Sequence, residues 1–231
     1  EYFRGKPMSG LSDFFGDTLT FWNSMVAHPD YDNFWKDRNP ARHLKDLKPA
    51  VLVTGGFYDA EDCYGAFKTY NEIKRLSPDC DLYLAAGPWY HGGWNNRKAN
   101  HLAGAWFAEE SGAYYLDNIE YPFFTYYLEG KGNASAKVNV LPSCETTRCT
   151  YSSWPPSDAQ PAKIFLSGTD SLNMSSQPDA MVFRTFTSDP ANPVPYMDVK
   201  SSGRDRGYMA ADQRFASARG DVLTYSGTVL S

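Results

Sequence analysis

The chain has 231 residues, 42% of them hydrophobic and 21% charged, so it is long and apolar enough to bury a core, and extensive disorder is excluded. Its 22 basic and 27 acidic residues give a formal net charge of −5, which excludes the strongly basic surface that binds nucleic acids or anionic membranes non-specifically. No apolar run approaches the ~18 residues of a membrane-spanning helix, and the first residues do not resemble a signal peptide.

Residues 1–48 predict a helical unit. Aromatic and apolar side chains recur at helical spacing over residues 14–26. Shorter helices are expected at residues 31–35 and 41–47, and nothing in this part of the sequence has the pattern of a strand.

Residues 50–128 alternate between strand and helix patterns. Two short apolar runs, residues 50–54 and 81–86, are each followed by glycine and predict buried parallel strands. Helical periodicity follows each run, over residues 61–76 and 113–128. This βαβα order predicts an α/β sheet with helices packed on it.

The pattern changes again from about residue 137. Short runs of strand-forming residues alternate with turns rich in Pro, Gly and Ser, which predicts an antiparallel β-sandwich. Too few such runs occur for a closed sandwich, and the chain has no initiator Met, so we expect a fragment of a longer polypeptide. The predicted strands cover residues 137–141, 163–166, 182–186 and 221–225.

The four cysteines predict no metal site, because no Cys-x-x-Cys pair occurs and histidine is scarce around them. Cys63 and Cys80 lie in apolar sequence and are expected to be buried thiols. Cys144 and Cys149 flank a short loop, and two alternatives stay open for them: a small disulfide or two unpaired loop residues. No phosphate loop or nucleotide-binding fingerprint occurs either, so no cofactor is expected.

An acidic residue and a histidine follow the two predicted strands, Asp59 after the first and His91 after the second. Because binding and catalytic groups of open α/β sheets lie beyond the C-terminal ends of the strands, we expect these two side chains to meet. Acid before histidine is also the chain order of the triad in serine hydrolases of this fold. Each residue has a simpler interpretation as well: Asp59 as a helix N-cap, and His91 as a donor to a carbonyl in a Gly-rich turn.

The serine nucleophile of such a hydrolase is not found in this sequence. It sits in a Gly-x-Ser-x-Gly elbow between a strand and a helix, and no such motif occurs in the 231 residues. If the protein is a serine hydrolase, we expect its nucleophile in a serine-bearing part of the same protein that precedes Glu1.

The segments around Asp59 and His91, residues 55–62 and 87–94, resemble the acid and histidine motifs of the cocaine-esterase and X-Pro dipeptidyl-peptidase-like hydrolases. Within that group, the sequence most resembles α-amino acid ester hydrolases and the related glutaryl-7-aminocephalosporanic acid acylases. Residues 28–35 are similar to a segment of their cap domain. Similarity to their C-terminal jelly roll extends over residues 154–156, 163–166, 188–195, 212–214 and 219–225.

The resemblance implies a fold of class α/β plus β in three parts. The chain would hold the end of a helical cap (residues 1–48), the C-terminal part of an α/β-hydrolase core (49–135) and the start of a jelly-roll β-sandwich (136–231). Asp59 and His91 would be the triad acid and base of an acyl-serine mechanism. The implied substrates are α-amino acid esters or β-lactam-type amides. An X-Pro dipeptidyl-peptidase, or another esterase or acylase, is the alternative activity.

The resemblance also implies residues that bind the substrate. Amino ester hydrolases hold the substrate's ammonium group with carboxylates, since a buried cation needs such partners, and Asp30 and Asp32 are the best matches. The simpler interpretation is that both acids cap the short helix predicted at residues 31–35. Tyr90, next to His91, is expected to line the acyl pocket.

A non-catalytic carbohydrate-binding β-module is the alternative from a different class. Aromatic residues make up 16% of the chain and its second half is β-rich, a combination that permits sugar binding on exposed rings. The α/β alternation and the two strand-end motifs favour the enzyme. The resemblance further suggests a periplasmic or secreted protein, with the cytoplasm as the alternative, and leaves open whether it forms a homo-oligomer.

Overall fold

The structure is a computed structural model that describes residues 10, 12–107, 110–143, 148–174, 183–199, 203 and 205–228. The chain divides into two compact units. The first unit comprises Glu1–Asn39, Gln160–Asp198 and Gln213–Ser231, and the second comprises Pro40–Ala159 and Val199–Asp212. In the described ranges, none of the helices is long and apolar enough to cross a membrane.

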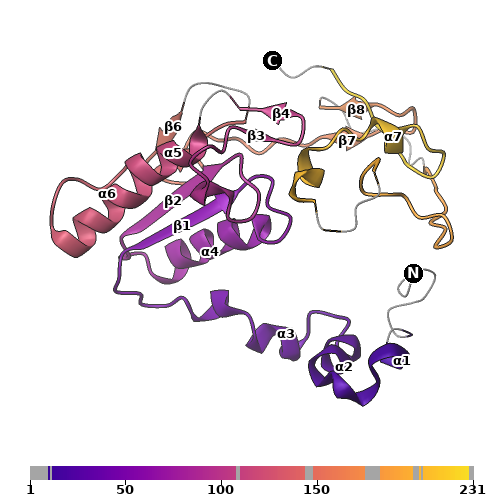
Figure 1. The fold of residues 1–231 in the computed structure, drawn as a ribbon, viewed down its shortest axis with the longest axis horizontal. Helices are drawn as coiled ribbons and strands as arrows, with labels where there is room; N and C mark the ends of the chain where they lie inside the picture. Colours follow the sequence, from indigo (N-terminus) through magenta and orange to yellow (C-terminus); the bar gives the residue numbers. More distant parts are fainter. Residues whose placement is uncertain are drawn as a thin grey trace. The chain divides into compact units, whose positions relative to one another are not determined.

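The second unit is built on a sheet of four strands in the order β1 (Val51–Gly56), β2 (Leu82–Gly87), β5 (Val138–Val140) and β6 (Cys149–Tyr151). The first three strands run parallel, as Figure 1 shows for β1 and β2, and β6 runs antiparallel to β5. Val53, Leu84 and Val138 lie side by side in this register, and the last two are completely buried.

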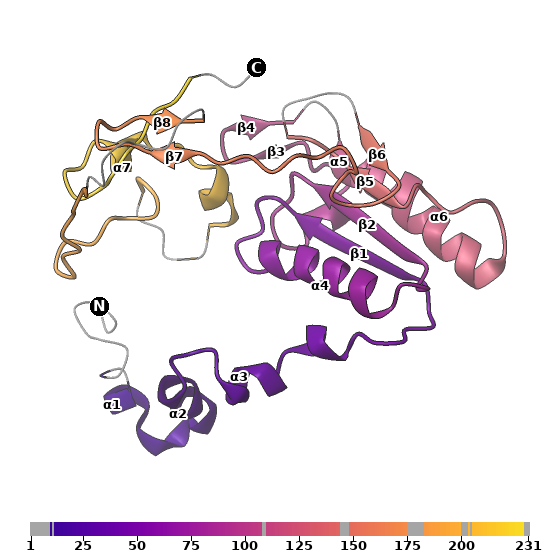
Figure 2. The ribbon, with the colours of Figure 1, turned by 180° about the vertical axis from the view of Figure 1, so that it is seen from behind.

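Helices cover both faces of this sheet. On one face lies α4 (Cys63–Leu76), whose Tyr70 and Ile73 pack with Leu84. On the other lies a continuous helix of residues 111–129, whose Tyr115 and Ile119 pack with Ala85. Successive strand residues point to opposite faces of the sheet, so Leu84 packs against α4 and Ala85 packs against the second helix. Figures 1 and 2 both show α4 on one side of β1 and β2 and the second helix on the other.

The second helix alternates between α-helical and wider π-helical turns. In chain order its parts are α5 (Ser111–Tyr115), η5 (Leu116–Glu120), α6 (Tyr121–Phe124) and η6 (Thr125–Glu129). The strands and helices predicted for residues 50–128 are thus all present. Strands β1 and β2 include the glycines that were expected to follow them, and end at Gly56 and Gly87. Shorter elements of the same unit are η3 (Pro40–His43), η4 (Gly93–Asn95), β3 (His101–Leu102), β4 (Ala105–Trp106) and η7 (Arg206–Ala210).

Two sequence-based expectations for this unit need correction. The strand expected in a sandwich at residues 137–141 is β5, a parallel neighbour of β2. All three of its residues are buried, which suits an interior strand of an α/β sheet better than a sandwich strand with one exposed face. The helix expected at residues 41–47 ends at His43. Asp46 takes a left-handed φ of 54°, and the Leu47 N–H donates to the Ser77 hydroxyl instead of to a helical carbonyl.

The first unit begins with short helices, as the sequence predicts. They are α1 (Ser12–Phe15), η2 (Gly16–Thr18), α2 (Thr20–Ala27) and α3 (Asn33–Asp37). Phe15 packs edge-on against Trp22, with ring centroids 5.4 Å apart.

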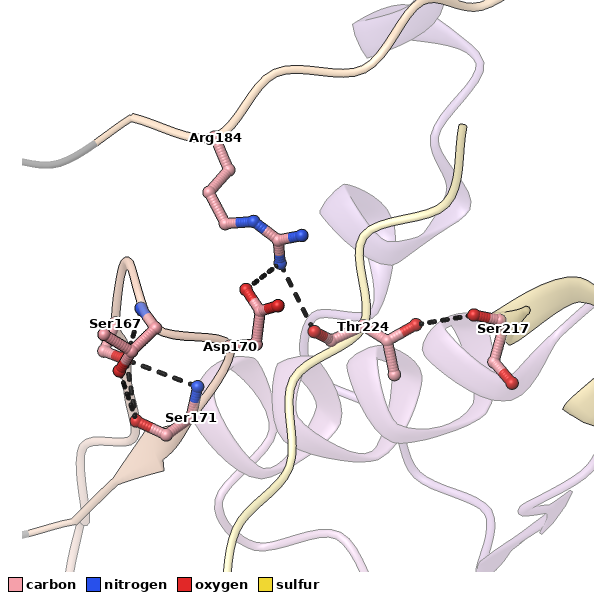
Figure 3. Close-up of polar contacts among 7 residues, drawn as sticks. Ser167, Asp170, Ser171, Arg184, Ser217 and Thr224 are labelled. Carbon is pink, nitrogen blue, oxygen red and sulfur yellow. Dashed lines mark hydrogen bonds and ion pairs between the residues drawn. The ribbon is translucent and has the colours of Figure 1, made fainter. Parts of the chain in front are cut away.

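The C-terminal segments of the first unit contain β7 (Phe165–Leu166), β8 (Leu172–Asn173) and α7 (Arg214–Ser217). The two strands pair antiparallel. At the turn between them, Asp170 has a φ of 62° and forms an ion pair with Arg184 at 2.5 Å, and the Ser167 and Ser171 hydroxyls lie 2.7 Å apart (Figure 3). A single bridge joins Ser171 to Ser226.

The strands expected at residues 182–186 and 221–225 are not formed. Val182 lies outside the described residues, and the rest of both segments is irregular. Phe183 and Phe186 are 78% and 59% exposed. Because strand preference depends mainly on packing against neighbours, the local pattern alone does not fix a strand here. The division into cap, core and jelly roll stays a prediction. So does the Cys144–Cys149 alternative, since Cys144 lies outside the described residues.

Candidate active site

The site begins where β1 and β2 end. Gly56 and Gly87 are direct partners in the parallel register, so the loops that follow them start side by side. The Tyr58 N–H then donates to the Trp89 carbonyl at 3.1 Å. A Cβ on Gly56 would lie 2.1 Å from that carbonyl oxygen, so this close approach of the two loops requires glycine.

The two loops bring Asp59 and His91 into hydrogen-bond contact. Asp59 Oδ2 and His91 Nδ1 are 2.9 Å apart. Asp59 Oδ1 accepts the backbone N–H groups of Glu61 at 2.8 Å and Asp62 at 3.0 Å. Asp59 is only 3% exposed, whereas the His91 side chain is 48% exposed. The acid therefore holds the histidine, as expected, but it is not the N-cap of α4: that position is Asp62, and Asp59 binds the backbone of the turn before the helix.

The pair stabilises a charged acid and a basic histidine. Burial alone would raise the pKa of Asp59, but the N–H groups of Asp62 and Glu61 and the contact with His91 outweigh it, and the pKa is lowered. The hydrogen bond to Asp59 raises the pKa of His91 above its usual value, and the nearby carboxylates of Glu61 and Asp62 add to this effect. Within the described chain, His91 Nε2 makes no hydrogen bond, so this nitrogen is available to accept a proton.

Trp89 fixes the loop that carries His91. Its ring is 1% exposed, and its Nε1 donates to the Ser111 hydroxyl at 2.9 Å. The Ser111 hydroxyl in turn donates to the Ala99 carbonyl at 2.6 Å. Ser111 was not identified from the sequence. The only signal for it is general, since a buried tryptophan N–H needs an acceptor.

A cavity of about 220 Å³ opens beside His91. Tyr90 lies in its wall, as expected for a residue of the acyl pocket, but a role in binding stays a prediction. Arg206 and Tyr208 come from a segment far along the chain and carry no recognisable motif, so the sequence did not point to them. The full lining comprises Tyr58, Ala60, Glu61, Tyr90, His91, Arg206 and Tyr208, all from the second unit.

Asp30 and Asp32 belong to the first unit. Asp32 caps α3, where its Oδ1 accepts the Phe34 N–H at 2.9 Å and its Oδ2 lies 2.5 Å from His28 Nδ1. The His28 contact is the main reason that the pKa of Asp32 is lowered. Asp30 is exposed, and its backbone carbonyl accepts the Asp32 N–H. The capping interpretation therefore holds for Asp32. In the described residues, no cluster of His, Cys, Asp and Glu is suited to a metal ion.

A parallel sheet with helices on both faces and an Asp–His pair beyond its strand ends defines an α/β-hydrolase arrangement. Residues 12–93 match the X-Pro dipeptidyl-peptidase (S15) family. Cocaine esterase from Rhodococcus sp. (strain MB1 Bresler) is 27% identical over 223 residues, which cover 90% of this chain and 37% of the esterase.

Two solved structures resemble the chain closely. One is an aminopeptidase from the marine sediment archaeon Thaumarchaeota archaeon, with a TM-score of 0.83 and 27% identity, covering 96% of this chain and 38% of that one. The other is an α-amino acid ester hydrolase, with a TM-score of 0.81 and 24% identity, and the match covers 98% of this chain and 39% of that one. The resemblance to cocaine-esterase and S15-like hydrolases is thus confirmed. The chain spans less than two-fifths of the length of each of these relatives.

Proposed function

We propose that the protein to which this chain belongs is a serine hydrolase of esters or amides that works through an acyl-serine intermediate. The observation that carries the proposal is the Asp59–His91 pair, 2.9 Å apart at two neighbouring strand ends, with His91 facing a cavity. The likeness to an esterase and a peptidase family supports the same reaction class.

In this mechanism, Asp59 holds the Nδ1–H of His91 and stabilises the imidazolium that forms. His91 Nε2 takes the proton of the serine hydroxyl as the serine oxygen attacks the carbonyl carbon. It then gives that proton to the leaving alcohol or amine. Water repeats the sequence on the acyl-serine and releases the acid. The 231 residues contain no Gly-x-Ser-x-Gly motif, so we place the nucleophile in a part of the protein outside this sequence.

For the substrate, we propose esters of α-amino acids or β-lactam-type amides with an amino-bearing acyl group. Asp30 and Asp32 are the groups proposed to hold the ammonium. The alternative is a peptidase that releases X-Pro dipeptides. It is favoured by the match of residues 12–93 to the S15 family and by the likeness to the archaeal aminopeptidase.

The test is labelling of the full-length protein with a fluorophosphonate probe, combined with ester turnover. We expect the wild type to be labelled at a serine and His91→Ala to lose turnover by about a thousandfold or more. Asp59→Asn should lose a similar factor, because its amide no longer fixes the histidine tautomer. His43→Ala is the matched control, since His43 is exposed, lies on η3 and does not line the cavity. Near-normal turnover in His91→Ala would contradict the proposal.

A further inference from the structure

The wall of the cavity beside His91 includes a cation, the guanidinium of Arg206. Among the described residues, no carboxylate forms an ion pair with it. Four other arginines each form an ion pair with a carboxylate: Arg75 with Glu72, Arg97 with Asp117, Arg184 with Asp170, and Arg219 with Asp221. Arg206 therefore presents a cation that no described carboxylate pairs with to the space in which a substrate of His91 would lie.

Arg206 is held in a way that leaves its donors available. Its guanidinium carbon lies over the Tyr90 ring, 5.1 Å from the ring centroid, a favourable cation–π arrangement. Among the described residues, no acceptor takes a hydrogen bond from its N–H groups. A guanidinium in this state presents a planar fork of donors that matches a carboxylate in a bidentate manner.

The short η7 segment that presents Arg206 is anchored to the second unit. The Asp205 side chain accepts the Gly207 N–H at 2.6 Å, and Gly207 is buried. A Cβ on Gly207 would lie 3.1 Å from the Ala103 Cβ, so the segment packs closely against the turn between β3 and β4. This packing fixes the backbone from which Arg206 reaches the cavity.

We propose that Arg206 is an anion subsite that binds a carboxylate of the substrate next to the scissile ester or amide. This inference rests on the proposed hydrolase function and adds a substrate class to it. The carboxylate belongs either to the acyl group or to the leaving group, and both present the same chemistry to the guanidinium. Glu61 also lines the cavity and repels a substrate carboxylate. We therefore expect such a carboxylate to be bound only where it contacts Arg206 directly.

The experiment compares matched esters with the full-length protein. On the acyl side, para-nitrophenyl hydrogen glutarate is compared with para-nitrophenyl pentanoate. On the leaving-group side, para-acetoxybenzoate is compared with para-acetoxybenzamide. The readout is the ratio of kcat/KM for the charged ester to that for its neutral partner. In Arg206→Gln we expect this ratio to fall by about tenfold to a hundredfold for one of the pairs, as for a lost charge-assisted hydrogen bond.

Two further variants sharpen the result. Arg206→Lys should retain part of the preference, because the charge remains while the fork is lost. Arg148→Gln is the matched control, since Arg148 is also exposed and lies 3.8 Å over a tyrosine ring, that of Tyr114, but does not line the cavity. It should leave both ratios unchanged.

The outcomes separate this inference from the proposed function. Hydrolysis of the neutral esters with ratios that are the same in wild type and Arg206→Gln would overturn the anion subsite and leave the hydrolase intact. A loss of both the neutral and the charged reactions in Arg206→Gln would also overturn it, since the residue would then act on something other than the carboxylate. No hydrolysis of any ester or amide by the wild type would overturn both proposals.

Discussion

Asp59 uses its two carboxylate oxygens for different partners. Oδ1 accepts the two backbone N–H groups that begin the turn before α4, and Oδ2 contacts His91 Nδ1. The N-cap of α4 is Asp62, so the helix-capping interpretation of Asp59 is wrong, but its carboxylate still binds the turn before the helix and His91 at the same time. The backbone contacts fix the carboxylate, and a fixed carboxylate can orient an imidazole that is itself half exposed.

The charges around His91 predict the pH dependence of hydrolysis. The proposed mechanism needs the neutral imidazole, because only an unprotonated Nε2 accepts the proton of the proposed serine nucleophile. The contact with Asp59 raises the pKa of His91 above 6.5. We therefore expect kcat/KM to fall as the pH drops through a midpoint above 6.5, measured as a pH profile of ester hydrolysis.

A neighbouring acid tests the origin of that midpoint. Asp62 Oδ2 lies 3.7 Å from His91 Nδ1, and its negative charge favours the imidazolium. Asp62→Asn should therefore move the midpoint to lower pH while the plateau rate stays within about twofold, because Asp62 is exposed and its charge is screened. Asp79→Asn, another exposed acid that lies outside the cavity wall, should leave the midpoint in place. A midpoint that does not respond to Asp62→Asn would argue against this electrostatic account.

At the scale of elements, the close approach of the two strand-end loops depends on Gly56. Replacing it with alanine would place a Cβ 2.1 Å from the Trp89 carbonyl oxygen, which accepts the Tyr58 N–H. We expect Gly56→Ala to push the Asp59 loop away from the His91 loop. This should lower the free energy of unfolding by about 1–3 kcal/mol and cut kcat much more than KM.

Thermal unfolding and steady-state kinetics of Gly56→Ala measure the two effects. Gly104→Ala is the control, because no heavy atom lies within 4 Å of the position that its Cβ would take, and its φ is not left-handed. If Gly56→Ala kept the wild-type kcat, the loops would not need this approach for catalysis.

The sequence was informative about elements whose signal is local. The β1 and β2 runs are apolar and end in glycine, and the rule that groups gather at strand ends was enough to predict that Asp59 meets His91. The partner of β5 was not predictable in this way. The run at residues 138–140 looks the same in a sandwich as in a parallel sheet, and only the packing of Val138 against Leu84 decides between them. Arg206 and Ser111 carry no motif at all, since each contributes through a contact with a distant segment.

At the scale of the whole molecule, the proposed ammonium site and the Asp59–His91 site lie in different units of the chain. Asp32 is already engaged, through its contacts with His28 and the Phe34 N–H. The Asp30 side chain makes no hydrogen bond or ion pair with any described residue. This difference favours Asp30 as the carboxylate that is available to a substrate, and Asp32 as a residue that shapes the α3 terminus.

The two acids can be separated by kinetics of amino and desamino esters. If Asp30 holds the ammonium, Asp30→Asn should raise KM for an α-amino acid ester about tenfold or more, and leave KM for the desamino ester unchanged, because only the first substrate loses an ionic partner. Asp32→Asn should change both substrates equally, through the α3 terminus. Asp17→Asn, an exposed acid of the same unit, is the control. An equal response of both esters to Asp30→Asn would reject the ammonium role of this residue.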